Sequence, residues 1–159
     1  MHLLWAYQDD GFLDQWQSRA LTTGRMPLQV TVMNWQKVRW VQSLLTFECP
    51  VVWVDVQKID RAWAKDGLYI GPGGIGDNQP IKYDRVGKWI AEFHQLEMCI
   101  ASLTENDVVA FTDGRHRFAW LRDHGAEALP IAADPADERE MRARFETQER
   151  ECRFRTLTL

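Results

Sequence analysis

The residues best suited to chemistry lie together in one short stretch, Asp113-Gly114-Arg115-His116-Arg117. A glycine turn that opens a helix directs several backbone N–H groups, and the positive end of the helix dipole, at one spot. We expect Gly114 and the following N–H groups to hold a phosphate, and Arg115 and Arg117 to neutralise its charge. His116 would orient the phosphate or transfer a proton. This stretch is our candidate phosphate site, with Asp113, His116 and Arg117 as candidate catalytic residues.

Asp113 has two expected roles that are compatible with each other. Its carboxylate can cap the following helix, and it can also bind a divalent cation that accompanies a phosphate. Asp55 and Asp60 are further candidate acids or bases, provided that the strands bring them close to the turn. The alternative is an ordinary strand–helix corner with solvated arginines, a common use of Asp-Gly turns.

The elements that position this turn are predicted from hydrophobic period. Residues 108–111 form a short β-prone run, and a helix is expected from Arg115 to His124, with Gly125 at its end. Further strands are predicted at 51–56, 99–103 and 128–133, and a hairpin turn at 104–107. Helices are predicted at 59–66 and 83–95. In the second of these, the apolar stripe of Val86, Trp89, Ile90 and Phe93 is expected to face the core.

The two ends of the chain have weaker patterns. We predict strands at 2–7 and 28–33 and a helix at 12–20, whereas residues 35–45 fit both periods and we favour a helix. Asp134 and Pro135 suit the start of a helix that runs to about residue 150 and carries Glu–Arg pairs four residues apart. We expect this helix to be peripheral and solvated, with a dimer or partner contact as the alternative.

The Gly-rich segment 71–76 is predicted to be a flexible surface loop. It lacks the Lys-Ser/Thr of a P-loop and does not link a clear strand to a clear helix. Gly-Pro clusters of this kind usually mark loops, although this one is also a candidate lid over a neighbouring site.

Composition limits the classes of protein that remain. The chain has 159 residues and a formal net charge of −4, which favours one α+β domain with a small mixed sheet and argues against nonspecific nucleic-acid binding over its whole surface. No apolar run is long enough to span a membrane and no leader pattern is present, so we expect a cytoplasmic protein. Three separated cysteines predict reduced thiols, and neither a metal-ligand spacing nor a serine-nucleophile motif is found.

Residues 111–131, Phe-Thr-Asp-Gly-Arg-His-Arg-Phe-Ala-Trp-Leu-Arg-Asp-His-Gly-Ala-Glu-Ala-Leu-Pro-Ile, resemble the ParB/sulfiredoxin superfamily. The order of the upstream elements extends the resemblance to about residues 50–133. It implies a fold in which a strand, a basic glycine turn, a helix and a final strand bind nucleotide phosphates. Arg115 stands where sulfiredoxins have their catalytic cysteine and where ParB proteins have a glutamate, so neither thiol chemistry nor CTP-gated clamping on DNA is expected.

Within that superfamily the chain is similar to plasmid fertility-inhibition proteins of the oncogenic-suppression type. This similarity implies a protein that blocks conjugative DNA transfer at the coupling ATPase or another part of the transfer machinery. It also implies ATP or another nucleotide with Mg²⁺ as a cofactor, and DNA contact through a local basic patch. The alternatives are a metal-dependent nuclease or NTPase that uses the same site, and a structural domain with a vestigial site. We expect a family-specific part at 1–49, the superfamily core at 50–133, and a charged C-terminal helix and tail at 134–159.

Overall fold

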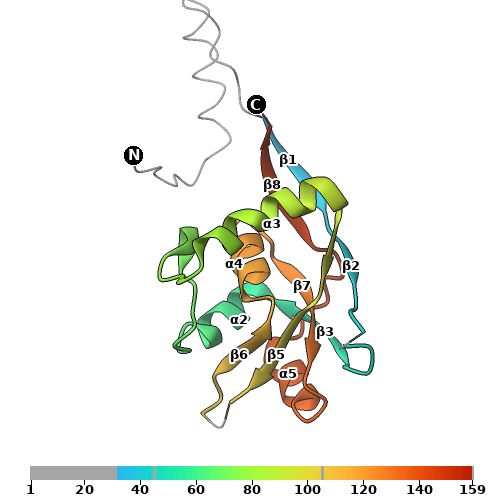
Figure 1. Ribbon diagram of the computed structural model, residues 1–159. Coiled ribbons are helices and arrows are strands. Elements are labelled where there is room, and N and C mark those ends of the chain that lie inside the picture. The colour runs from blue at the N-terminus through green and yellow to red at the C-terminus, as the bar shows by residue number, and fades with distance from the viewer. Residues whose placement is uncertain (1–31, 45, 105, 159) are drawn as a thin grey trace, which may run out of the picture. The chain divides into compact units, whose positions relative to one another are not determined.

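A four-stranded mixed sheet with strand order β3-β7-β5-β6 forms the centre of the computed structural model (Figure 1). Its strands are β3 (Val51–Asp55), β5 (Cys99–Leu103), β6 (Val109–Asp113) and β7 (Ala128–Ala133). β3 is antiparallel to β7 and β5 is antiparallel to β6, whereas β5 and β7 are parallel. The predicted α+β class, the small mixed sheet and all four of these strands are confirmed.

The structure describes residues 32–44, 46–104 and 106–158, of which 33–157 form one compact unit. The elements predicted at 2–7 and 12–20, and most of the strand predicted at 28–33, lie outside the described residues. No helix in the described part is long and apolar enough to cross a membrane. The cysteines are free, as predicted: Cys99 and Cys152 are buried and Cys49 is partly buried.

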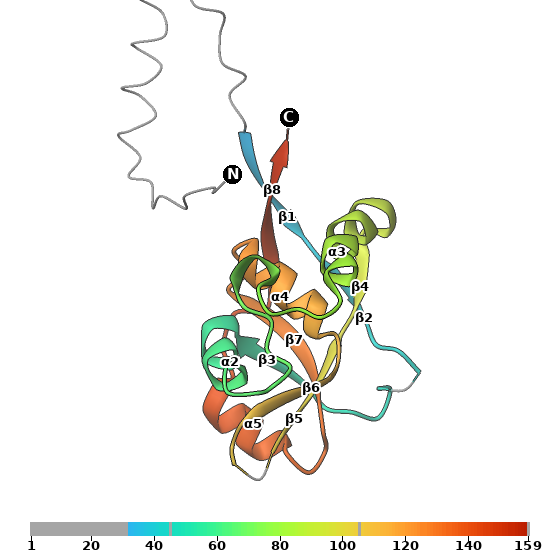
Figure 2. The same cartoon turned by 60° about the vertical axis from the view of Figure 1, so that its left-hand side comes forward.

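Four α-helices accompany the sheet in the described residues: α2 (Val56–Trp63), α3 (Pro80–Phe93), α4 (Arg115–Asp123) and α5 (Glu138–Phe145) (Figure 2). A single 3-10 turn, η1 (Pro72–Gly74), lies in the Gly-rich segment. Trp63 of α2 meets Phe111 of β6 and Phe118 of α4 edge-on, with ring centroids 5.0 and 5.6 Å away. This aromatic cluster fixes α2 and α4 against β6, the strand that leads into the candidate turn.

Helices α3 and α4 approach closely at Gly87. A Cβ atom at this position would lie 2.8 Å from Cζ2 of Trp120 on α4, closer than carbon atoms can pack. The contact leaves only a narrow stripe of α3 covered, in which Val86 and Ile90 are buried. The prediction that Trp89 and Phe93 also face the core is wrong, because these side chains are 54% and 45% exposed.

Residues 32–37 and 39–41 form strands, and the favoured helix at 35–45 is therefore wrong. β1 (Val32–Lys37) pairs with β8 (Arg153–Thr158), and β2 (Arg39–Val41) pairs in parallel with β4 (Gln95–Glu97). Pairing with segments distant in sequence supplies the backbone hydrogen bonds of both strands. The pairing with β8 and β4 therefore favours strands, although the hydrophobic pattern of residues 35–45 fits both a helix and a strand.

The C-terminal helix is shorter than predicted. Asp134 accepts a hydrogen bond from the Ala136 N–H and forms a turn instead of a helix cap, so α5 begins only at Glu138. It ends at Phe145 because Glu146 is extended and bridges to Val54 of β3. Of the predicted pairs, Glu138–Arg142 and Glu146–Arg150 form, whereas Arg144 pairs with Asp107 and Arg153 pairs with Glu151.

Candidate functional site

The candidate turn connects the end of β6 to the start of α4, as predicted. Gly114 is the N-cap residue and has φ +84°, a left-handed conformation that disfavours side chains. A Cβ atom there would also lie 2.9 Å from the Cα and Sγ atoms of Cys99 and from Nη2 of Arg117. Both the backbone conformation and the close packing therefore require glycine at position 114.

Asp113 does not cap the helix, so that expected role is corrected. Asp113 is the last residue of β6, and its carboxylate pairs with Nη2 of Arg117 at 2.6 Å. Because Gly114 is the N-cap residue and α4 begins at Arg115, the Asp113 carboxylate meets Arg117 in the first turn instead of the first N–H groups of the helix. The ion pair fixes Arg117 beside the turn.

Cys99 is buried behind the same turn. Its thiol donates to the Gly114 carbonyl oxygen over 3.3 Å, and burial raises the pKa of Cys99 to about 11 despite the nearby Arg117 guanidinium. The thiol is therefore protonated at neutral pH. Its role in this position is to pack and to donate one hydrogen bond.

The two residues that follow the Gly-rich segment meet the start of α4 through their side chains. Asp77 Oδ1 lies 3.1 Å from Nε2 of His116, and Asn78 Oδ1 accepts from Arg115 over 3.2 Å. The Asp77 side chain is only 1% exposed, and its second oxygen is buried without a hydrogen-bond partner in the described part. Burial lowers the pKa of His116, an effect that outweighs the hydrogen bond to Asp77. His116 is thus neutral at pH 7, the form that can accept a proton.

A cavity of about 360 Å³ opens beside this turn, between α3, β4 and the start of α4. Four basic side chains and two acidic ones contribute to its wall. The lining residues are Lys82, Arg85, Val86, Trp89, Leu96, Glu97, Asp113, Gly114, His116 and Arg117. The structure therefore brings Asp113, Gly114, His116 and Arg117 of the candidate site to one cavity, whereas Arg115 lies outside its lining.

Lys82 and Arg85 are site residues that the sequence analysis missed. They come from α3, three residues apart, and neither side chain has a hydrogen-bond or ion-pair partner within the part of the chain that the structure describes. The sequence does contain a pattern that could have identified them, because cations beside the apolar stripe of Val86 and Ile90 indicate the edge of a helix face that packs on the core. Their proximity to the turn depends on the packing of α3 against α4, which the sequence does not show.

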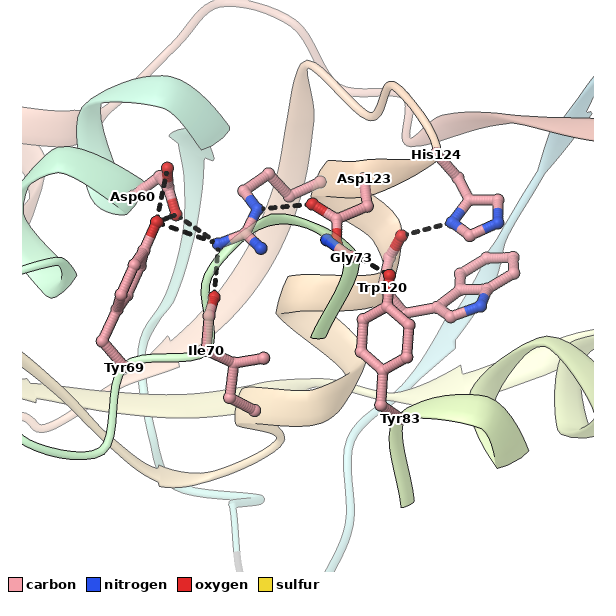
Figure 3. Close-up of polar contacts among 9 residues, drawn as sticks. Asp60, Tyr69, Ile70, Gly73, Tyr83, Trp120, Asp123 and His124 are labelled. Carbon is pink, nitrogen blue, oxygen red and sulfur yellow. Dashed lines mark hydrogen bonds and ion pairs between the residues drawn. The ribbon is translucent and has the colours of Figure 1, made fainter. Parts of the chain in front are cut away.

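The other candidate acids lie elsewhere. Asp55 caps α2 by accepting from the Lys58 N–H. Asp60 pairs with Nη1 of Arg122 at 2.6 Å, near the opposite end of α4 (Figure 3). The condition under which these two carboxylates are candidates is not met, because neither lines the cavity and each has a structural partner of its own.

Figure 3 shows the network that surrounds Arg122. Its guanidinium donates to Asp60, to Asp123 and to the carbonyl oxygen of Ile70. Asp123 in turn accepts from the Gly73 N–H at 2.8 Å and from the Tyr83 hydroxyl at 2.7 Å. Burial and the hydrogen bond to Asp123 raise the pKa of Tyr83. The network ties the Gly-rich segment to the C-terminal end of α4.

Metal ligation has few candidates near the cavity. The described residues contain no group of three or more His, Cys, Asp or Glu side chains arranged to hold an ion. Asp113 is paired with Arg117 and Asp77 with His116. Glu97 is the cavity carboxylate without a partner in the described residues. A Mg²⁺ ion carried by a nucleotide fits this donor set, because Mg²⁺ commonly takes one or two carboxylates together with substrate phosphates.

Comparison with known proteins adds one family match. Residues 81–145 match the family model of the plasmid fertility inhibition factor. Every residue that lines the cavity lies within this segment. The match supports the fertility-inhibition branch named by the sequence analysis, whereas the wider ParB/sulfiredoxin relationship stays a prediction.

Among solved structures, the chain is similar to a gold(I) cyanide derivative of Oncogenic Suppression Activity Protein, described as a plasmid fertility inhibition factor. The TM-score is 0.44 and the identity 18%, over 91% of this chain and 86% of that chain. No curated protein is significantly similar to the chain.

Proposed function

We propose that this chain is a plasmid fertility-inhibition protein that blocks conjugative DNA transfer, and that its cavity binds a phosphate group of a nucleotide or nucleic acid. One observation carries the proposal. A cavity with two cations, Lys82 and Arg85, whose side chains have no partner among the described residues, falls inside the segment that matches the fertility-inhibition family.

The charges around the cavity favour an anion. Lys82 and Arg85 have no acidic partner in the described residues, and Arg117 lies beside them with its charge directed at Asp113. The start of α4 adds the partial positive charge of its first N–H groups. A phosphate would gain charge-assisted hydrogen bonds from Lys82 and Arg85, and these two side chains would not have to break an existing ion pair with a described residue.

The partner that this proposal implies is the coupling ATPase or another protein of the transfer machinery. ATP or another nucleotide with Mg²⁺ is the proposed cofactor, held by Lys82, Arg85, His116 and Arg117 through its phosphates. Glu97 is the carboxylate available to the ion.

Transfer frequency tests the proposal directly. Donor cells that express the wild-type chain beside a conjugative plasmid should transfer that plasmid less often than donors with an empty vector. The double variant Lys82→Ala/Arg85→Ala should restore transfer, whereas Lys88→Ala, which removes an exposed cation of α3 outside the cavity lining, should still inhibit. An unchanged transfer frequency with the wild-type chain would overturn the proposed role.

A second candidate function is a metal-dependent nuclease or NTPase. It is favoured by the contact of His116 with Asp77, because a buried carboxylate that orients a neutral imidazole is a common general-base arrangement. Purified protein should then cleave plasmid DNA or ATP when Mg²⁺ is added. Activity that survives both His116→Ala and Arg117→Ala would exclude this site as its source.

A vestigial site is the remaining alternative. Calorimetric titration with ATP, CTP and ADP distinguishes it, because a vestigial turn should give no heat beyond dilution. Binding that is lost in Lys82→Ala/Arg85→Ala would instead assign the heat to the cavity.

A further inference from the structure

Two aromatic side chains on α3 lie in solvent at the edge of the cavity. Trp89 is 54% exposed and Phe93 is 45% exposed. Their ring centroids are 4.4 Å apart with planes tilted by 41°, so the two rings touch and form one continuous apolar surface. Exposed aromatic groups that cluster beside a polar site commonly mark a binding surface.

This aromatic surface is continuous with the cation row of the cavity. Lys82, Arg85, Trp89 and Phe93 follow one another at helical spacings of three and four residues, so they share one side of α3. The row spans about 16 Å from Lys82 to Phe93, at about 1.5 Å per residue. Trp89 belongs to the cavity lining, whereas Phe93 lies beyond it.

Cations beside exposed aromatic rings match the chemistry of single-stranded nucleic acid. The phosphates of a strand follow basic side chains, while its bases stack on aromatic rings without regard to their identity. A mononucleotide has one base and would use Trp89 at most. The extension of the aromatic surface to Phe93, outside the cavity, is accounted for by a ligand with at least two consecutive bases.

We propose that Trp89 and Phe93 form a base-stacking subsite, and that the ligand of the cavity is a single-stranded nucleic acid whose phosphate lies against Lys82 and Arg85. This inference rests on the proposed phosphate site and adds the class of its ligand. Duplex DNA is excluded from the subsite because its bases are stacked inside the helix and cannot reach the rings.

The test measures binding of a fluorescein-labelled twelve-residue oligothymidylate by anisotropy at fixed salt, beside inorganic phosphate by calorimetry. Trp89→Ala and Phe93→Ala should each weaken oligothymidylate binding roughly 5- to 10-fold, in line with the loss of one stacked base. Phe93→Ala, which changes no residue of the cavity lining, should leave phosphate binding unchanged. Trp89→Phe should retain most of the affinity, because it keeps a ring. Phe47→Ala, which removes another exposed aromatic side chain outside the cavity lining, is the matched control and should bind as wild type.

The outcomes separate the subsite from the phosphate site. If phosphate binds but Trp89→Ala and Phe93→Ala hold the oligonucleotide as well as wild type, the subsite is wrong and the phosphate site stands. If Lys82→Ala/Arg85→Ala changes the binding of neither probe, the phosphate site fails and the subsite fails with it. Equal binding of the corresponding duplex, or displacement of the oligonucleotide by polyglutamate at equal charge, would show that charge alone is recognised and would overturn the stacking proposal.

Discussion

The cations near the two ends of α4 differ in whether they have partners within the protein. At the C-terminal end, Arg122 has four hydrogen-bond partners, and its side chain is 10% exposed. At the N-terminal end, Lys82 and Arg85 project into a cavity without partners in the described residues. The Arg122 guanidinium donates most of its hydrogen bonds inside the protein, whereas the donors of Lys82 and Arg85 are left for a ligand. The buried ion network around Arg122 therefore serves the fold, although Nη2 of Arg122 has no hydrogen-bond partner in the described residues. The cations Lys82 and Arg85 mark the candidate site.

The comparison predicts its largest effect at Arg122. Arg122→Ala would leave the carboxylates of Asp60 and Asp123 without their cation in a partly buried environment, and should lower the free energy of unfolding by about 3 kcal/mol. Urea denaturation followed by circular dichroism measures the change. Lys37→Ala, which breaks an exposed ion pair with Glu151, serves as the control and should leave the midpoint nearly unchanged. Equal shifts in the two variants would contradict the structural role of the network.

The second effect concerns the glycines that flank α4. Gly114 and Gly125 have φ angles of +84° and +80°, so alanine at either position should cost about 1–2 kcal/mol of stability through its backbone alone. Gly114→Ala should cost more than Gly125→Ala, because only its Cβ atom meets neighbours at 2.9 Å, against 3.5 Å at Gly125. Thermal unfolding of the two variants tests this order, and the reverse order would show that the turn relaxes freely around Gly114.

A smaller effect is expected from the histidines near each end of the helix. Burial lowers the pKa of both His116 and His124 below the usual value of about 6.5. The unfolded chain therefore binds more protons than the folded protein at acidic pH, and stability should fall as the pH decreases below about 6.5. Above about pH 6.5 neither histidine should contribute to the dependence of stability on pH. The melting temperature between pH 8 and pH 5 measures this dependence.

Substitution of each histidine separates the loss of stability at acidic pH into the contributions from the two ends of α4. His116→Gln and His124→Gln should each flatten the dependence of the melting temperature on pH. Saturating phosphate should weaken the effect of acid at His116, because an anion favours the imidazolium, and should not change it at His124. An identical response to phosphate in both single variants would mean that the anion does not bind at the N-terminal end.

The smallest change in stability is expected in the cavity itself. Lys82→Ala and Arg85→Ala remove no side-chain hydrogen bond to another described residue, so the free energy of unfolding should stay within about 0.5 kcal/mol of wild type. Phosphate affinity should nevertheless fall in both variants. A loss of stability comparable to that of Arg122→Ala would show that these cations have structural partners, and the contrast between the two ends of α4 would disappear.

Local patterns were enough to predict the elements around the turn. The strand–glycine–helix order at 109–123 follows from a β-prone run, a glycine and a change of period, all within about fifteen residues. β8 was missed although Cys152 and Phe154 are buried and alternate with the exposed Arg153 and Arg155. We predicted a charged helix and tail instead of a strand, because Glu–Arg pairs four residues apart are typical of a helix even where the backbone is extended.

Site composition was harder to predict than site position. The turn itself could be located because Gly114 to Arg117 are consecutive. Asp77, however, meets His116 across 39 positions of sequence, and Arg85 reaches the cavity only because α3 lies on α4. Contacts of this kind depend on helix packing, for which a single sequence gives no direct signal.

The absence of a side chain at Gly87 allows the close approach of α3 to α4. Trp120 cannot yield there, because it is stacked on His124 at 3.6 Å and held edge-on by Phe154. One added methyl group at Gly87 would therefore act as a wedge between α3, which carries Lys82 and Arg85, and α4, which carries His116 and Arg117. The distance between the two helices therefore depends on a position outside the cavity lining, and a substitution at Gly87 should change anion binding without altering any residue that lines the cavity.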